Sequence, residues 1–244
     1  MKKLGFAVLG FVLLGSSCLF RNSPQGAADE LAALAAKGDE TTYAAVYRFS
    51  FVQQFAPGQT TKLEIVQQPP TFIRRVETTT QPETGKPVSL TAWYIRNAEG
   101  AYACTEFEKV GVRCQVKPID AATFGSAKLN VYFDTPRDAD AFSSVRKAAR
   151  PVRIAGQQGT CFEAVPVSAS ARPGSPEPSP DRFRYELCYA DDGVLLRGKQ
   201  TTLDDGGTAD QAESFVQVTS VSHVVEPREL RLPGPVVDPD SLQE

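Results

Sequence analysis

The most regular pattern in the chain is an alternation of apolar and polar residues over residues 42–55. Along this stretch every second position is mainly polar, as at Thr42, Arg48 and Gln54, and the positions between them are apolar. Successive side chains of a β-strand point to opposite faces, so this period of two predicts a strand with one aromatic face and one polar face. The apolar positions share one parity: Tyr43, Ala45, Tyr47, Phe49, Phe51 and Phe55.

Further β-type runs follow along the chain and are separated by turn residues. Most form hairpins with their sequence neighbours, as at Asp191-Asp192-Gly193, because Asp-Gly suits a tight turn. An antiparallel, strongly curved sheet of about nine to eleven strands is therefore expected. The run over residues 88–95 is apolar on both parities, which predicts that it is covered on both faces. The predicted strands span residues 61–67, 71–78, 88–96, 101–107, 159–167, 181–190, 194–200 and 213–225.

Two other segments have helical periodicity. Residues 27–37 are rich in Ala and Leu and have acidic residues in the first turn, where carboxylates favour the helix dipole. Gly38 is expected to end this helix. Residues 135–150 begin with a Thr-Pro pair that suits a helix start. Their apolar residues recur at helical spacing, at Ala139, Phe142, Val145 and Ala149. About two or three helices are therefore expected against the sheet.

The N-terminus has the order of an export signal. Lysines at positions 2 and 3 precede an apolar stretch over residues 4–14, which is too short to span a bilayer comfortably. The segment LLGSSC resembles a bacterial lipoprotein signal. This resemblance implies that residues 1–17 are removed and that Cys18 becomes the lipidated first residue; the alternative is that Cys18 is discarded with the signal. Residues 18–26 are then expected to form a polar, lipid-anchored tether.

Four of the five cysteines are expected to form two disulfides in the exported chain. Cys104 and Cys114 lie ten residues apart, which suits two opposite positions of a hairpin. Cys161 and Cys188 flank residues 168–180, a loop whose four prolines are unsuited to regular structure. This pairing leaves the candidate lipidated residue as the odd cysteine.

Composition and charge restrict the classes of function. The chain has 244 residues, 41% of them hydrophobic, which is enough for a single core. Its net charge of −3 and lack of a basic stripe give no electrostatic case for nucleic acid as a partner.

The single histidine, His223, has no recognisable nucleophile or second base and is interpreted as structural. The Asp-Asp-Gly sequences at 191–193 and 204–206 are interpreted as turns rather than Ca²⁺ loops. The chain is therefore predicted to be no enzyme and to use no cofactor and no metal.

Several stretches together carry a family resemblance: the helix at residues 29–37 followed by YAAVYRFSF, GQQGTCF at 156–162, YELCYADDGVLLR at 185–197, and the closing FVQVTSVSHV with PRELRLP. This order resembles the LolA-like superfamily of bacterial envelope lipoproteins, especially the LppX/LprG-type lipid-binding lipoproteins. The resemblance implies an α+β, mainly β fold, a half-barrel of antiparallel strands wrapped over helices, as one domain over residues 27–226. The Pro-rich and acidic residues 227–244 are expected to be an extended or disordered tail.

In that family the hollow between sheet and helices can hold acyl chains. The resemblance therefore implies a protein that binds or carries an amphiphile without covalent chemistry. The alternative is a filled core, in which case the chain would be a non-enzymatic envelope interaction or sensing module. The candidate lining residues are Tyr43, Tyr47, Phe49, Phe51, Leu63, Ile65, Leu90, Trp93, Tyr94 and Phe142.

The expected partners follow from these two hypotheses. One is the membrane, reached through lipidated Cys18 at the outer face of the cytoplasmic membrane or elsewhere in the bacterial envelope. The others are a lipid or glycolipid cargo and an envelope protein. A cluster of cations is a further candidate for contact with lipid headgroups, with a solvated helix end as the alternative. It consists of Arg146, Lys147, Arg150 and Arg153.

Overall fold

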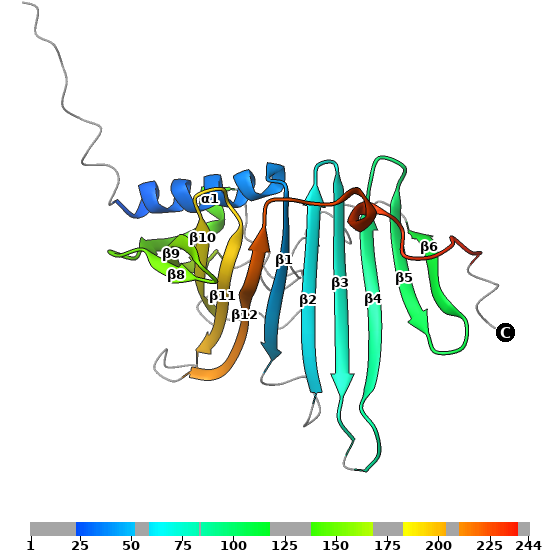
Figure 1. Cartoon of the computed structure of the whole chain (residues 1–244). Helices are drawn as coiled ribbons and strands as arrows, with labels where there is room; N and C mark the ends of the chain where they lie inside the picture. The colour runs from blue at the N-terminus through cyan, green and yellow to red at the C-terminus, as the bar shows by residue number, and fades with distance from the viewer. Residues whose placement is uncertain are drawn as a thin grey trace, which may run out of the picture.

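The computed structural model describes residues 23–51, 59–82, 84–117, 138–167, 183–203 and 210–238. In this part of the chain twelve strands form one sheet, and the helix α1 (Pro24–Glu40) lies against it (Figure 1). Two short 3₁₀ turns are η3 (Ala139–Ala141) and η4 (Pro227–Leu230). The strands are β1 (Tyr43–Phe51), β2 (Gln59–Gln68), β3 (Thr71–Thr80), β4 (Val88–Arg96), β5 (Ala101–Phe107), β6 (Gly111–Lys117), β7 (Phe142–Lys147), β8 (Val152–Ile154), β9 (Gln157–Pro166), β10 (Phe183–Ala190), β11 (Leu195–Leu203) and β12 (Asp210–Ser222).

The sheet consists of two halves that each follow the order of the chain. Strands β1 to β6 lie side by side in one half, and β12 to β9 do so in the other, with β7 and β8 beside β9. The halves meet where β1 pairs with β12, for example at Tyr47 opposite Val218. The sheet stays open, with α1 across one end (Figure 1). The predicted antiparallel half-barrel is confirmed, with twelve strands and, in the described residues, one α-helix.

The helix α1 starts at a strong N-terminal cap. The Ser23 hydroxyl accepts a hydrogen bond from the backbone N–H of Gly26 at 3.1 Å, and Pro24 takes the first helical position, where a missing N–H costs little. The predicted helix is therefore confirmed but longer. It includes residues 24–26, which were expected to belong to the tether, and it continues past Gly38 to Glu40. Its buried side chains are mostly small: Ala27, Ala28, Leu31, Ala32 and Ala35.

Two hydrophobic clusters lie on opposite faces of the sheet, because side chains alternate along each strand. The larger cluster packs under α1, and we call its side of the sheet the helix face. Leu31, Tyr47 and Phe162 in this cluster are 0% exposed. On the other side, which we call the tail face, Leu232 of the C-terminal segment packs against the smaller cluster. That cluster consists of Ile73, Ile95, Tyr102, Cys104 and Cys114.

The C-terminal segment crosses the tail face as far as residue 238 (Figure 1). The backbone N–H of Cys114 donates to the carbonyl oxygen of Pro235 at 2.9 Å, and the N–H of Val237 donates to the oxygen of Cys114 at 2.8 Å. An extended tail is thus found, but η4 and these bonds contradict disorder before residue 239. Burial of Leu232 on an apolar sheet face outweighs the polar composition that suggested disorder.

The helix predicted for residues 135–150 is wrong in its described part, where η3 and then β7 take its place. The pairing of β7 with β9 shifts register between Phe142 and Ser144, so a β-bulge adds one residue to the strand there. Phe142 and Val145 consequently both face the core although they are three residues apart. In the sequence this spacing imitates a helix.

The strand β4 is covered on both faces over only part of its length, which corrects the expectation for residues 88–95. Ile95 is buried on the tail face, and Trp93 packs beside it. Val88 and Leu90 are 66% and 56% exposed. The start of β4 lies at the end of the sheet away from α1 and from the C-terminal segment (Figure 1).

Both predicted disulfides are confirmed. Cys104 and Cys114 are directly opposite each other in β5 and β6, and Cys161 and Cys188 are opposite each other in β9 and β10. Disulfides are typical of exported proteins, since the cytosol keeps thiols reduced.

Some sequence predictions concern residues outside the described ranges. They are the signal at residues 1–17, the lipidation of Cys18, the first part of the tether and the Pro-rich loop at 168–180. None of the helices within the described ranges combines the length and the apolar character needed to cross a membrane.

Candidate functional site

The space directly beneath α1 is filled by side chains of the sheet. Tyr47 donates from its hydroxyl to the carbonyl oxygen of Leu195 at 3.0 Å, so its buried polar atom is satisfied. Half of the candidate lining residues belong to this packed core and are at most 9% exposed. They are Tyr43, Tyr47, Leu63, Ile65 and Phe142.

Burial also controls the ionisation of the two core tyrosines. Desolvation raises the pKa of Tyr43 and of Tyr47 well above the usual tyrosine value, and the nearby carboxylate of Asp192 acts in the same direction. Both phenols therefore stay protonated in the folded protein over the physiological range of pH.

Beyond α1, the helix face carries four apolar side chains with threonines between them, and those on β4 are the most exposed. Phe49 and Val76 are half-buried and pack against the margin of the core. Leu90 is 56% exposed and Val88 is 66% exposed. We call these four residues the apolar strip. A contiguous exposed apolar patch is a candidate contact surface.

Strand pairing shows that the apolar strip lies on a single face. Phe49 is opposite Thr61, Thr61 is opposite Thr78, and Thr78 is opposite Leu90. The hydroxyl oxygen of Thr61 is buried and has no hydrogen-bond partner among the described residues. Such a group costs about 1–3 kcal/mol relative to a satisfied one. A ligand that carries a hydrogen-bonding group beside an apolar chain would remove this cost.

The other candidate lining residues are distributed over both faces. Tyr94 lies on the helix face, where the guanidinium carbon of Arg74 is 4.3 Å from its ring centroid. Desolvation lowers the pKa of Arg74, and Tyr94 opposes that shift. Trp93 points to the tail face, with Arg75 at 5.8 Å from its ring centroid. The side chain of Phe51 lies outside the described part of the structure.

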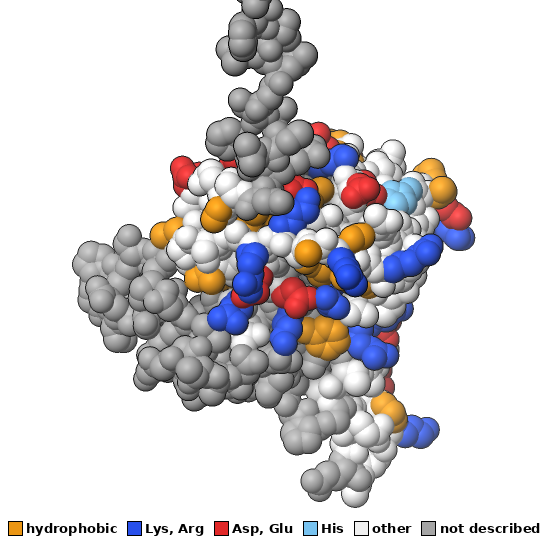
Figure 2. All heavy atoms as spheres, turned by 90° about the vertical axis from the view of Figure 1, so that its left-hand side faces the viewer, with side chains coloured by type: hydrophobic (Ala, Val, Ile, Leu, Met, Phe, Trp, Pro, Cys, Tyr) orange, Lys and Arg blue, Asp and Glu red, His pale blue; other side chains and the backbone are white. Residues whose placement is uncertain are grey.

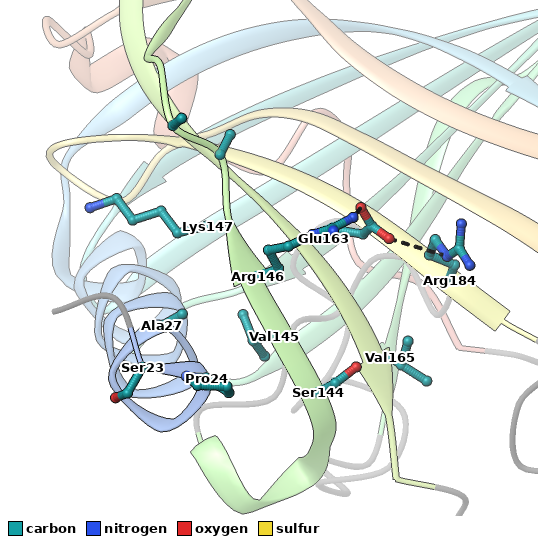
Figure 3. Close-up of a pocket in the computed structure, with 12 residues that line it drawn as sticks. Ser23, Pro24, Ala27, Ser144, Val145, Arg146, Lys147, Glu163, Val165 and Arg184 are labelled. Atoms are coloured by element: carbon teal, nitrogen blue, oxygen red, sulfur yellow. Dashed lines mark hydrogen bonds and ion pairs between the residues drawn. The ribbon is translucent and has the colours of Figure 1, made fainter. Parts of the chain in front are cut away.

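A hollow of about 930 Å³ opens beside the N-terminal end of α1 (Figure 3). Its charged lining comes from β7, β9 and β10. Glu163 lies between two arginines, with Oε2 at 2.7 Å from Nη2 of Arg146 and Oε1 at 3.4 Å from Nε of Arg184. Nζ of Lys147 lies 2.6 Å from Oε1 of Glu30 on α1. One carboxylate thus serves two guanidinium groups at the rim of this hollow.

The predicted cluster of cations is only partly brought together. Arg146 and Lys147 line the hollow on β7, and Arg150 follows them at an exposed position. Arg153 lies on β8 and donates from Nε to the carbonyl oxygen of Gly156 at 3.2 Å. Arg184 joins the hollow from β10, although its distance in sequence gave no indication of this. The alternative of a solvated helix end does not apply, because these residues are not helical.

The C-terminal end of α1 is held by a glutamine, Gln67, that no motif in the sequence indicates. Nε2 of Gln67 donates to the carbonyl oxygens of Gly38 and Thr41 at 2.7 and 2.8 Å. These carbonyl oxygens lie at the C-terminal end of the helix, where no N–H group of a following helical turn is available to donate to them. Gln67 is 2% exposed. The available signal was its parity, which it shares with the buried Ile65 of the same strand.

Two further groups that could carry chemistry, His223 and the Cys161–Cys188 pair, have local contacts. Nε2 of His223 lies 2.5 Å from Oδ2 of Asp192, in a pair at the surface. Cys161 and Cys188 lie close to Glu186, but their sulfurs form a disulfide and so offer no thiolate to a metal.

Comparison with known proteins gives matches of structure alone. No family model matches the chain, and no curated protein matches it. Among solved structures the chain is similar to LprF from Mycobacterium bovis, at 11% identity and a TM-score of 0.46, over 88% of this chain and 99% of that one. It is also similar to MucB in complex with MucA(peri), at 15% identity and a TM-score of 0.41, over 89% of this chain.

The resemblance to the LolA-like superfamily stays a prediction from the sequence, because both TM-scores are below 0.5. The chain spans 59% of the length of the MucB chain. At these identities and TM-scores, no residue role is carried over from either protein to this chain.

Proposed function

We propose that this protein is an exported, membrane-anchored lipoprotein that binds an amphiphile on the helix face of its sheet, without covalent chemistry. The observation that supports this proposal is the apolar strip, in which the core face continues into exposed aliphatic side chains. Val88 and Leu90 contribute little to packing at 66% and 56% exposure. An acyl chain laid along the strip would remove them from water.

The chemistry of the strip suits a lipid or glycolipid cargo. Each methylene that leaves water contributes about 0.8 kcal/mol, so a few contacts along an acyl chain give measurable affinity. The buried Thr61 hydroxyl, which lacks a partner among the described residues, offers one hydrogen bond beside the apolar surface. An apolar chain with a polar group next to it is the composition of an amphiphile.

The anchor belongs to the same proposal. Residues 1–17 have the order of an export signal, and the lipoprotein-like segment ends at Cys18. Ser23, which caps α1, lies five residues further on, so the anchored end of the chain leads directly into the fold. Replacing Cys18 by Ala is expected to release the protein from the membrane fraction, and unchanged fractionation would refute the anchor.

A second candidate is an envelope interaction or sensing module with a protein partner. The filled space beneath α1 favours it, since Leu31, Tyr47 and Phe162 are 0% exposed there. In this case the apolar strip would meet a protein surface instead of an acyl chain.

Mass spectrometry of bound lipid separates the two candidates. The chain from Leu19 onward, secreted in its native host and purified without detergent, would be extracted with organic solvent. A stoichiometric acylated species is the expected result and would give the class of cargo. A clean extract would favour the interaction module.

A matched pair of variants locates the site. Leu90→Ser changes the strip, whereas Val224→Ser changes a side chain that is 75% exposed outside the strip and near the C-terminal segment. With parinaric acid as a fluorescent probe, Leu90→Ser is expected to weaken binding about tenfold, and Val224→Ser to leave it unchanged. Equal affinities for both variants would remove the strip from the proposal.

A further inference from the structure

Three cations line the hollow at the N-terminal end of α1, namely Arg146, Lys147 and Arg184, and the exposed Arg150 follows the lining residue Ala149 in the chain. We call these four residues the basic rim. Figure 2 looks onto this side of the molecule, where Lys and Arg side chains gather around a few acidic ones. The cations come from β7, from the residues that follow it and from β10. Residues 146–150 thus supply three of the cations, and the fold adds Arg184 from a distant part of the chain.

The rim has an excess of positive charge. Its two acidic partners are Glu163, which faces two arginines, and Glu30, which pairs with Lys147. Counting only the four cations and the two carboxylates that pair with them, two positive charges are left over, in a chain whose net charge is −3. The side chain of Arg146 is 79% exposed and that of Arg184 is 45% exposed, so both guanidinium groups reach water.

A guanidinium group that shares a carboxylate keeps N–H donors for a second anion. Arg146 meets Glu163 through Nη2 and Arg184 meets it through Nε, which are different edges of the two planar groups. Such planar forks match phosphate oxygens well. The geometry is thus compatible with phosphate groups that approach from outside the hollow.

The position of the rim along the chain limits its distance from the membrane anchor. Ser23 and Pro24 line the same hollow, and Ser23 is five residues after Cys18. Five residues span at most about 18 Å when fully extended. A bilayer that holds Cys18 would therefore lie within about two Debye lengths of this end of α1 at physiological salt.

We propose that the basic rim docks on an anionic bilayer surface and turns the N-terminal end of α1 toward the membrane. This inference rests on the proposed anchor at Cys18 for its place in the cell, and it is independent of any cargo in the apolar strip. A basic residue close to an anionic lipid surface raises binding by about fivefold, so three of them contribute about a hundredfold. The lipid anchor holds the protein near the bilayer, and the basic rim sets the orientation of the protein on it.

The test uses the chain from Leu19 onward, which retains every described residue and lacks the acyl acceptor. Its sedimentation with phosphatidylglycerol vesicles is compared with its sedimentation with phosphatidylcholine vesicles. The rim variant is R146Q/R150Q/R184Q. The control variant, R48Q/R228Q/R231Q, removes the same charge from exposed arginines on β1 and in the C-terminal segment. Circular dichroism checks that each variant is folded.

The expected result is binding to phosphatidylglycerol vesicles that weakens with added salt and is absent with phosphatidylcholine. The rim variant should lose at least about tenfold in affinity, and the control variant should stay near the parent chain. If the rim variant does not fold, the single exposed change Arg150→Glu should still weaken binding several-fold relative to Arg228→Glu.

Three results would overturn the proposal: no binding to anionic vesicles, equal binding to both kinds of vesicle, or equal losses in the rim and control variants. The lipid extract remains a separate measurement. A clean extract with intact vesicle binding would reject the cargo and keep the rim, whereas bound lipid without vesicle binding would do the reverse.

Discussion

Gly38 of α1 and Gly193 of the turn between β10 and β11 meet backbone to backbone. A Cβ atom on Gly38 would lie 2.2 Å from the carbonyl oxygen of Gly193, and one on Gly193 would lie 2.2 Å from the amide nitrogen of Gly38. Both distances are far shorter than van der Waals contact. The end of the helix therefore reaches this turn because neither residue has a side chain.

Replacing Gly38 by Ala is expected to lower the free energy of unfolding by about 1–3 kcal/mol, because the added methyl group meets backbone that cannot move aside. Helix propensity alone favours the Ala variant by about 1 kcal/mol, so the two effects have opposite signs. Urea denaturation of both proteins gives the answer. A more stable variant would show that the close contact is absent in solution.

Gly193→Ala should be more damaging than Gly156→Ala. Both glycines have positive φ, of 85° and 80°, but only Gly193 has atoms in the place of a Cβ. Backbone strain alone should cost Gly156→Ala about 1 kcal/mol, and the clash should add to that cost at Gly193. Equal losses in thermal unfolding experiments would argue against docking of α1 on this turn.

Gln67→Ala is expected to loosen the last turn of α1 and to cost about 1–3 kcal/mol, since it leaves buried carbonyl oxygens without a donor. Hydrogen exchange should accelerate at the amides near the end of the helix. The neighbouring Gln68 is exposed and serves as the control, because Gln68→Ala should change neither quantity. Similar exchange in both variants would contradict the capping role.

Truncation after Val225 should expose the tail face of β4, β5 and β6. The apolar cluster around Ile95 and Tyr102 would lose its contact with Leu232, at an expected cost of about 1–3 kcal/mol in unfolding free energy. Binding of an apolar dye such as ANS should rise. A chain that ends at residue 238 keeps the described segment and should behave as the parent, so an effect of equal size in both truncations would point to another cause.

Alkaline pH should destabilise the protein through Tyr43 and Tyr47. Their pKa values are raised in the folded state, mainly by desolvation, whereas unfolded tyrosines ionise near a pH of about 10. Their contribution to stability is therefore complete below about pH 10 and falls above it, by about 1.4 kcal/mol per pH unit for each tyrosine.

Tyrosinate absorbance and circular dichroism, followed in one titration, check this expectation. The two phenols should ionise together with unfolding, and Tyr43→Phe should reduce the steepness of the alkaline transition. Ionisation of these tyrosines in the intact fold at their ordinary pKa would contradict their burial.

The strands and both disulfides could be predicted because their determinants are local. A period of two identifies the strand that starts at Tyr43, and Asp-Gly identifies the turn at 191–193. Cys104 and Cys114 lie symmetrically about one hairpin, so their pairing follows from the same pattern. The antiparallel half-barrel then follows from the order of such units.

The segment around Phe142 could not be assigned correctly from periodicity. A β-bulge places Phe142 and Val145 on one face at a spacing of three, and no residue type marks the bulge. The docking of the C-terminal segment on the sheet could not be predicted for a related reason. Its composition is polar, yet Leu232 alone gives it an apolar partner on the sheet.

The site was harder to predict than the fold. The parity of a residue predicts the face of the sheet on which it lies, but not which other elements cover that face. Tyr47 and Leu90 both lie on the helix face, but Tyr47 is 0% exposed and Leu90 is 56% exposed. The difference depends on where α1 ends above the sheet. The pairing of Glu163 with arginines from two strands likewise depends on the folded sheet, which no motif in the sequence encodes.

The pairing of β1 with β12 sets the order in which the protein can assemble. Strands β2 to β6 need only sequence neighbours, whereas the joint between the halves brings Ala44 opposite Ser222, near the two ends of the described chain. Closing so long a loop is slow compared with forming hairpins. In a chain that emerges from an export channel with its N-terminus first, β1 can pair with β2, but its other edge stays unpaired until β12 emerges. Completion of the sheet therefore waits until nearly the whole polypeptide has crossed.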